Sequence, residues 1–154
     1  RARVFAGARV APWRFPVRFL RVITVVGAVS VALPLLVPDA RMVALVWSGF
    51  VLLLEPVNYR RGRASWMGAL ATGDASLVLA LMGSGLLCGV LWEFWNYWAL
   101  TRWTYSVLYV GSLKLFEMPL PGYLGFPPFA LECYAMYHWL RGWLGDESHD
   151  RAML

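Results

Sequence analysis

Residues 76–100 read SLVLALMGSGLLCGVLWEFWNYWAL, and this stretch decides the fold class. Positions 76–92 carry no charged side chain. A helix rises 1.5 Å per residue, so about 20 apolar residues cross the hydrocarbon core of a bilayer. The stretch therefore predicts a transmembrane helix over 76–100, and its aromatic end is typical of a membrane interface.

The composition of the whole chain agrees with a membrane protein. Of its 154 residues, 60% are hydrophobic and only 15% are charged, with a mean hydropathy of +0.56. Soluble domains are about 25% charged, so an ordinary soluble domain and a disordered chain are both excluded. Because the chain begins with Arg1 and not with Met, we expect an incomplete or processed N-terminus.

Three further apolar runs predict helices at 20–38, 42–58 and 127–144. Pro34 should kink the first, and the last should begin at two prolines, which suit a first helical turn. The first run could also be a signal peptide, but no small-residue cleavage site follows it, so an uncleaved span is favoured. Prolines and glycines between 103 and 126 predict an irregular segment: an external loop, a re-entrant stretch or a short strand pair.

We therefore expect an all-α membrane protein with about four transmembrane helices. A single helical domain, 20–144, would lie between a basic tail at 1–19 and a polar tail at 145–154. In this layout eleven of the 14 Lys and Arg residues fall on one side of the membrane. The positive-inside rule then places both termini in the cytoplasm, in a bacterial inner membrane. The net charge of +5 suits anionic lipid, and we expect no nucleic-acid partner.

An acidic residue within a membrane span costs free energy, so each one is a candidate functional group. Glu93 shares one helical face with Gly85, Gly89, Asn96 and Tyr97. The two glycines should allow a neighbouring helix to approach closely, so Glu93 should point into the protein. Burial without a nearby cation would keep the carboxyl group neutral. A structural hydrogen bond between helices and a substrate or proton role both remain open.

Glu132 lies one turn into the last predicted helix, near mid-membrane. Glu93 and Glu132 could meet and share a proton, although the sequence does not show that they meet. Glu55 lies near the inner interface, where an ion pair with Arg60 or Arg61 is expected. No nucleotide or metal motif is present, and the cofactor stays unknown.

Aromatic residues around these acids form a candidate ligand pocket. His138 could also ligate haem or a chlorin, but a lone histidine is weak evidence. The pocket residues are Trp95, Trp98, Phe126, Phe129, Tyr134 and His138. The two cysteines, Cys88 and Cys133, are interpreted as packing residues without a disulfide.

The patterns WEFWNYW at 92–98, KLFEMP at 114–119 and GFPPFALECY at 125–134 resemble a family of uncharacterised bacterial multi-pass membrane proteins. That resemblance covers about the second half of the chain and implies no activity. A weaker similarity is to the small integral-membrane lycopene cyclases, whose Pro-x-Glu-acid motif is not matched, because three residues separate Pro128 from Glu132 and Cys133 follows. It implies a hydrophobic isoprenoid or lipid as substrate class.

Two functions remain open from the sequence. The first is a membrane-embedded site that binds or transforms an isoprenoid or lipid by acid catalysis, with Glu93 or Glu132 as the acid and Asn96 and Tyr97 orienting it. The second is a non-catalytic accessory or scaffold subunit of a larger membrane complex that binds lipid, pigment or partner helices. A transporter is disfavoured because no internal repeat is visible.

Overall fold

The computed structural model describes residues 5–37, 39, 42–105 and 113–145. Four long helices dominate it: α1 (Val17–Leu36), α2 (Val43–Arg60), α4 (Ser76–Trp98) and α5 (Phe126–Trp143). These helices agree with the four predicted segments to within three residues at each end. The polar tail after Gly145 and the first four residues lie outside the described part.

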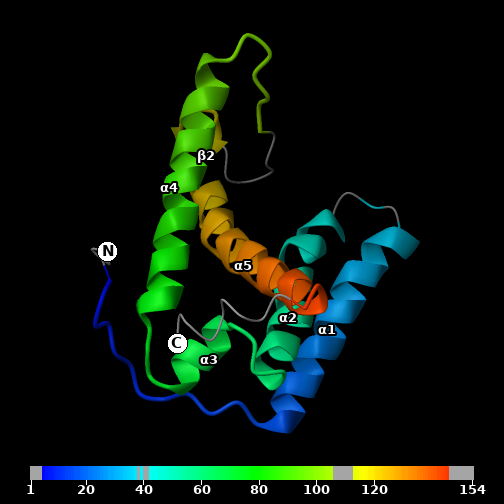
Figure 1. The fold of residues 1–154 in the computed structure, drawn as a ribbon. Helices are drawn as coiled ribbons and strands as arrows, with labels where there is room; N and C mark the ends of the chain where they lie inside the picture. Colours follow the sequence, from blue (N-terminus) through cyan, green and yellow to red (C-terminus); the bar gives the residue numbers. More distant parts are fainter. Residues whose placement is uncertain (1–4, 38, 40–41, 106–112, 146–154) are drawn as a thin grey trace.

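The helices pack in the order α1, α2, α5, α4. In Figure 1, α5 runs between the α1–α2 pair and α4, so α1 and α4 lie on opposite sides of it. Helix α3 (Trp66–Ala71) connects the two halves at one end. At the other end, strands β1 (Lys114–Leu115) and β2 (Met118–Pro119) pair antiparallel before the 3₁₀ helix η2 (Leu120–Gly125).

The predicted irregular segment thus contains a short strand pair, one of the three forms that the sequence allowed. Helix α5 begins at Phe126, with prolines in its first turn as predicted. Pro34 lies inside α1 near its end. Positions 107, 109 and 110, whose side chains favour a strand, fall outside the described residues.

Small residues let the helix backbones approach closely. A Cβ atom on Gly27 of α1 would lie 2.8 Å from the carbonyl oxygen of Gly49 in α2. A Cβ atom on Gly85 of α4 would lie 2.9 Å from the Cβ of Ala130 in α5. Both distances are shorter than van der Waals contact, so these positions require glycine. The close approach expected at Gly85 and Gly89 is confirmed.

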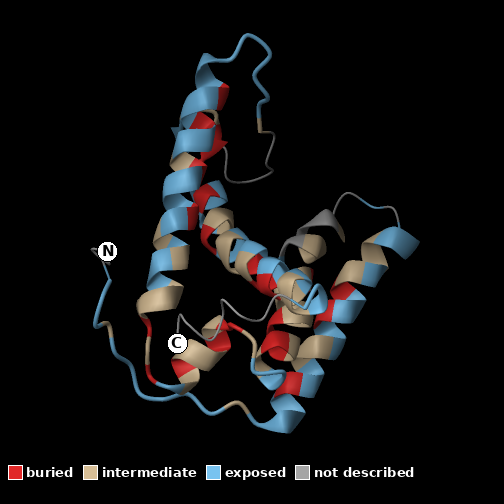
Figure 2. Ribbon diagram, viewed as in Figure 1, coloured by how far each residue is buried: buried red, intermediate tan, exposed pale blue. Residues whose placement is uncertain are grey.

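The interior of the protein is unusually polar and its surface unusually apolar. Among the described residues, eight buried hydrophobic side chains accompany eight buried polar or charged ones, and Glu55 and Glu93 are among the largest that are fully buried. Figure 2 shows that burial within the long helices follows the stripes where they meet, while their outward faces are exposed. Those faces include Val22, Val25 and Leu87. Soluble proteins seldom expose contiguous apolar surface of this kind.

Two of the helices, α1 and α4, are long and apolar enough to cross a membrane, and little of either is buried. Helices α2 and α5 are of similar length but carry buried polar side chains such as Asn58 and His138. The structure therefore contains two candidate spans by length and composition.

Candidate functional site

Glu93 lies at the centre of a hydrogen-bond network at the C-terminal end of α4. Its side chain is fully buried, as its face of α4 predicts. Glu93 Oε1 accepts a 2.5 Å hydrogen bond from the Tyr105 hydroxyl, and Oε2 accepts a 3.5 Å bond from Asn96 Nδ2. The carboxylate is thereby engaged with the segment that follows α4.

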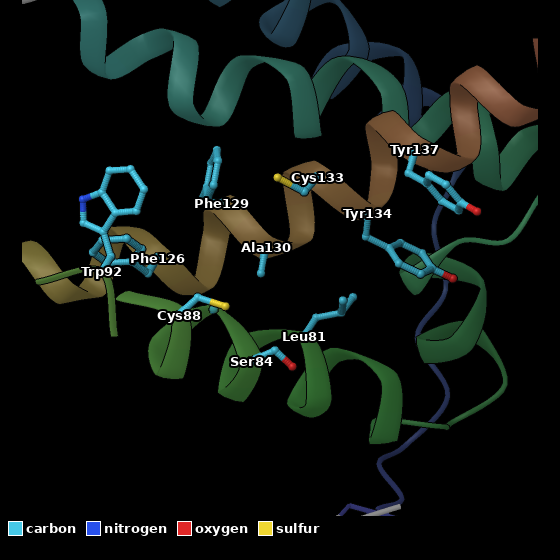
Figure 3. Close-up of a pocket in the computed structure, with 11 residues that line it drawn as sticks. Leu81, Ser84, Cys88, Trp92, Phe126, Phe129, Ala130, Cys133, Tyr134 and Tyr137 are labelled. Atoms are coloured by element: carbon cyan, nitrogen blue, oxygen red, sulfur yellow. The ribbon is translucent and has the colours of Figure 1, made fainter. Parts of the chain in front are cut away.

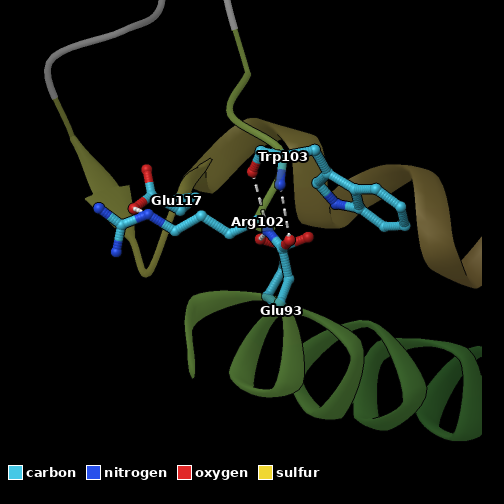
Figure 4. A network of polar contacts seen from close by, with 5 residues as sticks. Glu93, Arg102, Trp103 and Glu117 are labelled. Carbon is cyan, nitrogen blue, oxygen red and sulfur yellow. Dashed lines mark hydrogen bonds and ion pairs between the residues drawn. The ribbon is translucent and has the colours of Figure 1, made fainter. Parts of the chain in front are cut away.

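Asn96 fixes the backbone of the same segment. Its Nδ2 donates to the Trp103 carbonyl oxygen at 3.0 Å, and its Oδ1 accepts from the Trp103 amide at 3.1 Å. Figure 4 shows Trp103 held above the end of α4 in this way. The Trp103 ring in turn stacks on the Trp92 ring, with centroids 5.4 Å apart. Glu93 and Asn96 therefore have a clear structural role.

Arg102 is the cation nearest to Glu93 in sequence, but it pairs elsewhere. Its Nε lies 3.3 Å from Glu117 Oε1, which joins the segment after α4 to the turn between β1 and β2 (Figure 4). Its guanidinium also lies over the Tyr97 ring, which contacts Phe116. Tyr97 is thus part of an aromatic contact outside the Glu93 network.

Tyr105 lies outside the helices, and this network raises its pKa. Partial burial, followed by the hydrogen bond to Glu93 and the charge of that carboxylate, raises the pKa of Tyr105 to about 12. Each of these effects favours the neutral phenol. Tyr105 therefore stays a hydrogen-bond donor throughout the physiological pH range.

Glu55 is buried in a different place and does not form the expected ion pair. Its Oε1 accepts hydrogen bonds from Ser65 Oγ at 2.6 Å and from the Met67 amide at 2.9 Å, which fixes the start of α3 to α2. Arg60 and Arg61 are exposed. They lie five and six residues from Glu55, about 140° and 120° around the helix, so they point away from it.

Glu132 lies on the stripe of α5 that faces α2. Ala135, on the same stripe, accepts a 2.8 Å hydrogen bond at its carbonyl oxygen from Asn58 Nδ2 of α2. Glu132 is 5% exposed, and its Oε2 has no hydrogen-bond partner. Within the described residues, no hydrogen bond or ion pair joins Glu93 to Glu132, because one belongs to the α4 terminus and the other to the α2–α5 contact.

An apolar pocket of about 470 Å³ lies between α4 and α5. Figure 3 shows side chains from both helices around it, including both cysteines, which are free and exposed. Its volume is within the range of small-molecule sites. The lining residues are Leu81, Ser84, Gly85, Cys88, Trp92, Phe126, Phe129, Ala130, Cys133, Tyr134 and Tyr137.

Only some of the predicted site residues line the α4–α5 pocket. Phe126, Phe129 and Tyr134 line it. Trp95 and Trp98 are each 69% exposed and point outward from α4. His138 is buried, with its ring 4.3 Å from that of Tyr134 between centroids. Of the four candidate catalytic residues, Glu93, Asn96, Tyr97 and Glu132, none lines the pocket.

Several residues of these sites were not predicted as site residues. Cys88 and Cys133 line the pocket rather than serving only as packing residues, and Tyr105 and Trp103 complete the Glu93 network. Ser65 caps α3, and a capping serine before a short helix is a signal that the sequence does contain. Within the described residues, no group of three His, Cys, Asp or Glu side chains could hold a metal ion.

Comparison with known proteins adds no relative. The chain matches no protein-family model, and no match was found among curated proteins or among solved structures.

Proposed function

We propose that this protein is a four-span membrane protein that binds a hydrophobic isoprenoid or lipid chain in the pocket between α4 and α5. The α4–α5 pocket is the observation that carries the proposal. Its lining is mostly aromatic and aliphatic, and its few polar side-chain groups are the hydroxyls of Ser84, Tyr134 and Tyr137, the two thiols and the Trp92 indole N–H. Such a surface favours a hydrocarbon chain over a polar metabolite.

The distribution of polar residues supports four spans. Besides α1 and α4, helices α2 and α5 are each 18 residues long, and Asn58 of α2 donates to the Ala135 carbonyl oxygen of α5. Asn58 and Glu132 are buried in that contact and not presented to lipid. A polar residue in a bilayer is tolerated when it faces the interior of the helical bundle.

The cationic end of the molecule supports an inner-membrane protein with cytoplasmic termini. Phe15, just before α1, contacts Tyr59 at the end of α2, so the start of α1 and the end of α2 lie together. The exposed arginines at this end are Arg14, Arg18, Arg21, Arg60 and Arg61. Cations of this kind face the anionic cytoplasmic leaflet.

The pocket favours binding over acid catalysis. A general acid must reach the bond that it protonates, within about 3 Å or through one water. Glu93 and Glu132 lie outside the pocket lining, and both oxygens of Glu93 are already hydrogen-bonded. The acid-catalysis hypothesis would therefore need a different ligand position from the one that the pocket offers.

The test is to purify the protein in nanodiscs and measure the bound chain by mass spectrometry. Cys133→Trp should fill the pocket and lower the amount of bound chain by about tenfold, which corresponds to roughly 1.4 kcal/mol of binding free energy. Met136→Trp is the matched control, because Met136 is exposed on the same helix outside the pocket. Equal amounts in both variants, with folding intact, would contradict the proposal.

A second candidate function is an accessory subunit of a membrane complex. It is favoured by α1, which packs on α2 and leaves an apolar face of Val22, Val25, Val26 and Val29 exposed. A partner helix could cover that face. The same purification would favour this function if it recovered a stoichiometric membrane protein and no small molecule.

A further inference from the structure

The α4–α5 pocket has two chemically different ends. Gly89 of α4 lies against the Phe126 ring, and Gly85 lies against Phe126 and Ala130, so the two helices run antiparallel along the pocket. Trp92 and Phe126 therefore form one end, which is aromatic and whose only side-chain polar group is the Trp92 indole N–H. Tyr134 and Tyr137 lie at the other end, and Figure 3 shows their hydroxyls pointing away from Trp92.

Positive charge lies next to the tyrosine end. The Arg141 guanidinium carbon is 5.5 Å from the centre of the Tyr137 ring. Arg63 reaches the same end of α5, where its two terminal nitrogens donate to the carbonyl oxygens of Trp139 and Gly142. Among the lining residues there is no acidic side chain. The tyrosine end is thus the end at which a negative charge would be stabilised.

We propose that the ligand is an amphiphile with a single anionic head group, such as a phosphate ester of a hydrocarbon chain. Its chain would fill the pocket toward Trp92 and Phe126, and its head would lie at Tyr137 and Arg141. Arginine binds phosphate oxygens through paired N–H groups, and a tyrosine hydroxyl adds a further donor. This inference rests on the proposed function, because it specifies which end of the same pocket holds which part of the ligand.

Position along the membrane supports this direction. The tyrosine end belongs to the C-terminal half of α5, and Arg63 connects that half to the segment just after α2. This is the end of α2 that carries Arg60 and Arg61. A bound amphiphile would thus have its head level with the cationic end of the protein, where lipid head groups lie, and its chain toward the bilayer interior.

The experiment compares farnesyl phosphate with farnesol, which has the same chain without the charge. Binding is measured by native mass spectrometry in nanodiscs of phosphatidylcholine, with hexadecyl phosphate as a third probe. We expect farnesyl phosphate to bind at least about tenfold more tightly than farnesol, the value for one charge-assisted contact. Added salt should weaken the binding of farnesyl phosphate and leave the binding of farnesol unchanged.

Two variants locate the head group. Arg141→Gln should remove the preference for farnesyl phosphate over farnesol without changing farnesol binding. Tyr137→Phe should reduce that preference. Arg18→Gln is the control, since it removes an exposed cation of the same end, whereas Arg141 lies over the ring of the lining residue Tyr137. Equal loss in Arg18→Gln and Arg141→Gln would assign the preference to general surface charge and overturn the inference.

The outcomes separate this inference from the proposed function. Equal binding of farnesyl phosphate and farnesol by the unmodified protein would overturn the proposed anionic head group and leave the proposed chain-binding pocket intact. Failure of all three probes to bind would instead overturn the pocket as a chain-binding site. Tight binding of hexadecyl phosphate and not of farnesyl phosphate would identify the chain as a straight lipid chain and preserve the head-group assignment.

Discussion

Replacing Gly85 with alanine tests the packing that creates the pocket. The added methyl group would lie 2.9 Å from the Cβ of Ala130 and the same distance from the carbonyl carbon of Phe126. Carbon atoms pack best at about 3.5–4.0 Å, and a backbone carbonyl cannot move aside as a flexible side chain can. We expect the overpacking to destabilise the fold by about 1–3 kcal/mol.

Gly83→Ala is the matched control, two residues earlier on the same helix. Its methyl group would meet the edge of the Phe5 ring at 3.4 Å, which is ordinary contact. Alanine is favoured over glycine in a helix, so this change should be neutral or stabilise the fold by up to about 1 kcal/mol. Reversible unfolding in mixed micelles, followed by tryptophan fluorescence, measures both variants. Equal stability of Gly85→Ala and Gly83→Ala would refute the close α4–α5 approach.

Three further predictions concern the polar contacts. Tyr105 should titrate near pH 12 by phenolate absorbance, and Glu93→Gln should lower its pKa toward the ordinary value of 10. The folded protein holds the Tyr105 proton more tightly than the unfolded chain does. The stabilisation from this proton should therefore be complete below pH 10 and disappear as the pH rises to about 12. An unfolding free energy that stays constant over that range would contradict this prediction. Ser65→Ala should cost about 1–3 kcal/mol, because it removes a helix cap and a hydrogen bond to a buried carboxylate, whereas the exposed Ser48→Ala should change stability by less than about 0.5 kcal/mol. Arg102→Gln should cost no more than about 1 kcal/mol because its ion pair is partly exposed, and a larger loss would show that the contact is not screened by water.

The sequence predicted the helices well because each has a long apolar run with a clear stop. It also predicted most of the buried face of α4: Gly85, Gly89, Glu93 and Asn96 recur at helical spacing and are buried, whereas Tyr97, expected on the same face, is 38% exposed. The outward position of Trp95 follows from the same geometry: it lies two residues from Glu93, about 200° around the helix. Helical spacing therefore indicated that Trp95 points outward, although its aromatic side chain had favoured a place in the ligand pocket.

The partners of the buried acids could not be predicted in the same way. Ser65 and Met67 reach Glu55 through a turn whose path the sequence does not specify, and they replace the expected arginines. Tyr105 reaches Glu93 from outside any regular element. Such contacts depend on how a loop folds back, and hydropathy and periodicity do not determine this.

The pocket was the least predictable feature, because it depends on the angle between two helices. Phe126 and Phe129 were expected near a ligand from their aromatic character, and they do line the α4–α5 pocket. Cys88 and Cys133 were interpreted as packing residues, since a small thiol in an apolar run is most often buried. Both cysteines are instead exposed and line one shared pocket between α4 and α5.

These two native cysteines offer the most direct test that the pocket holds a hydrocarbon chain. In nanodiscs, both thiols should react with a lipophilic maleimide, and a saturating amount of farnesyl phosphate should slow both reactions by at least about tenfold, as expected for a site that is more than nine-tenths occupied. A cysteine introduced by Leu36→Cys, exposed at the end of α1, should react at the same rate with and without the amphiphile. Unchanged labelling of Cys88 and Cys133, or equal slowing at all three positions, would contradict a chain-binding pocket between α4 and α5.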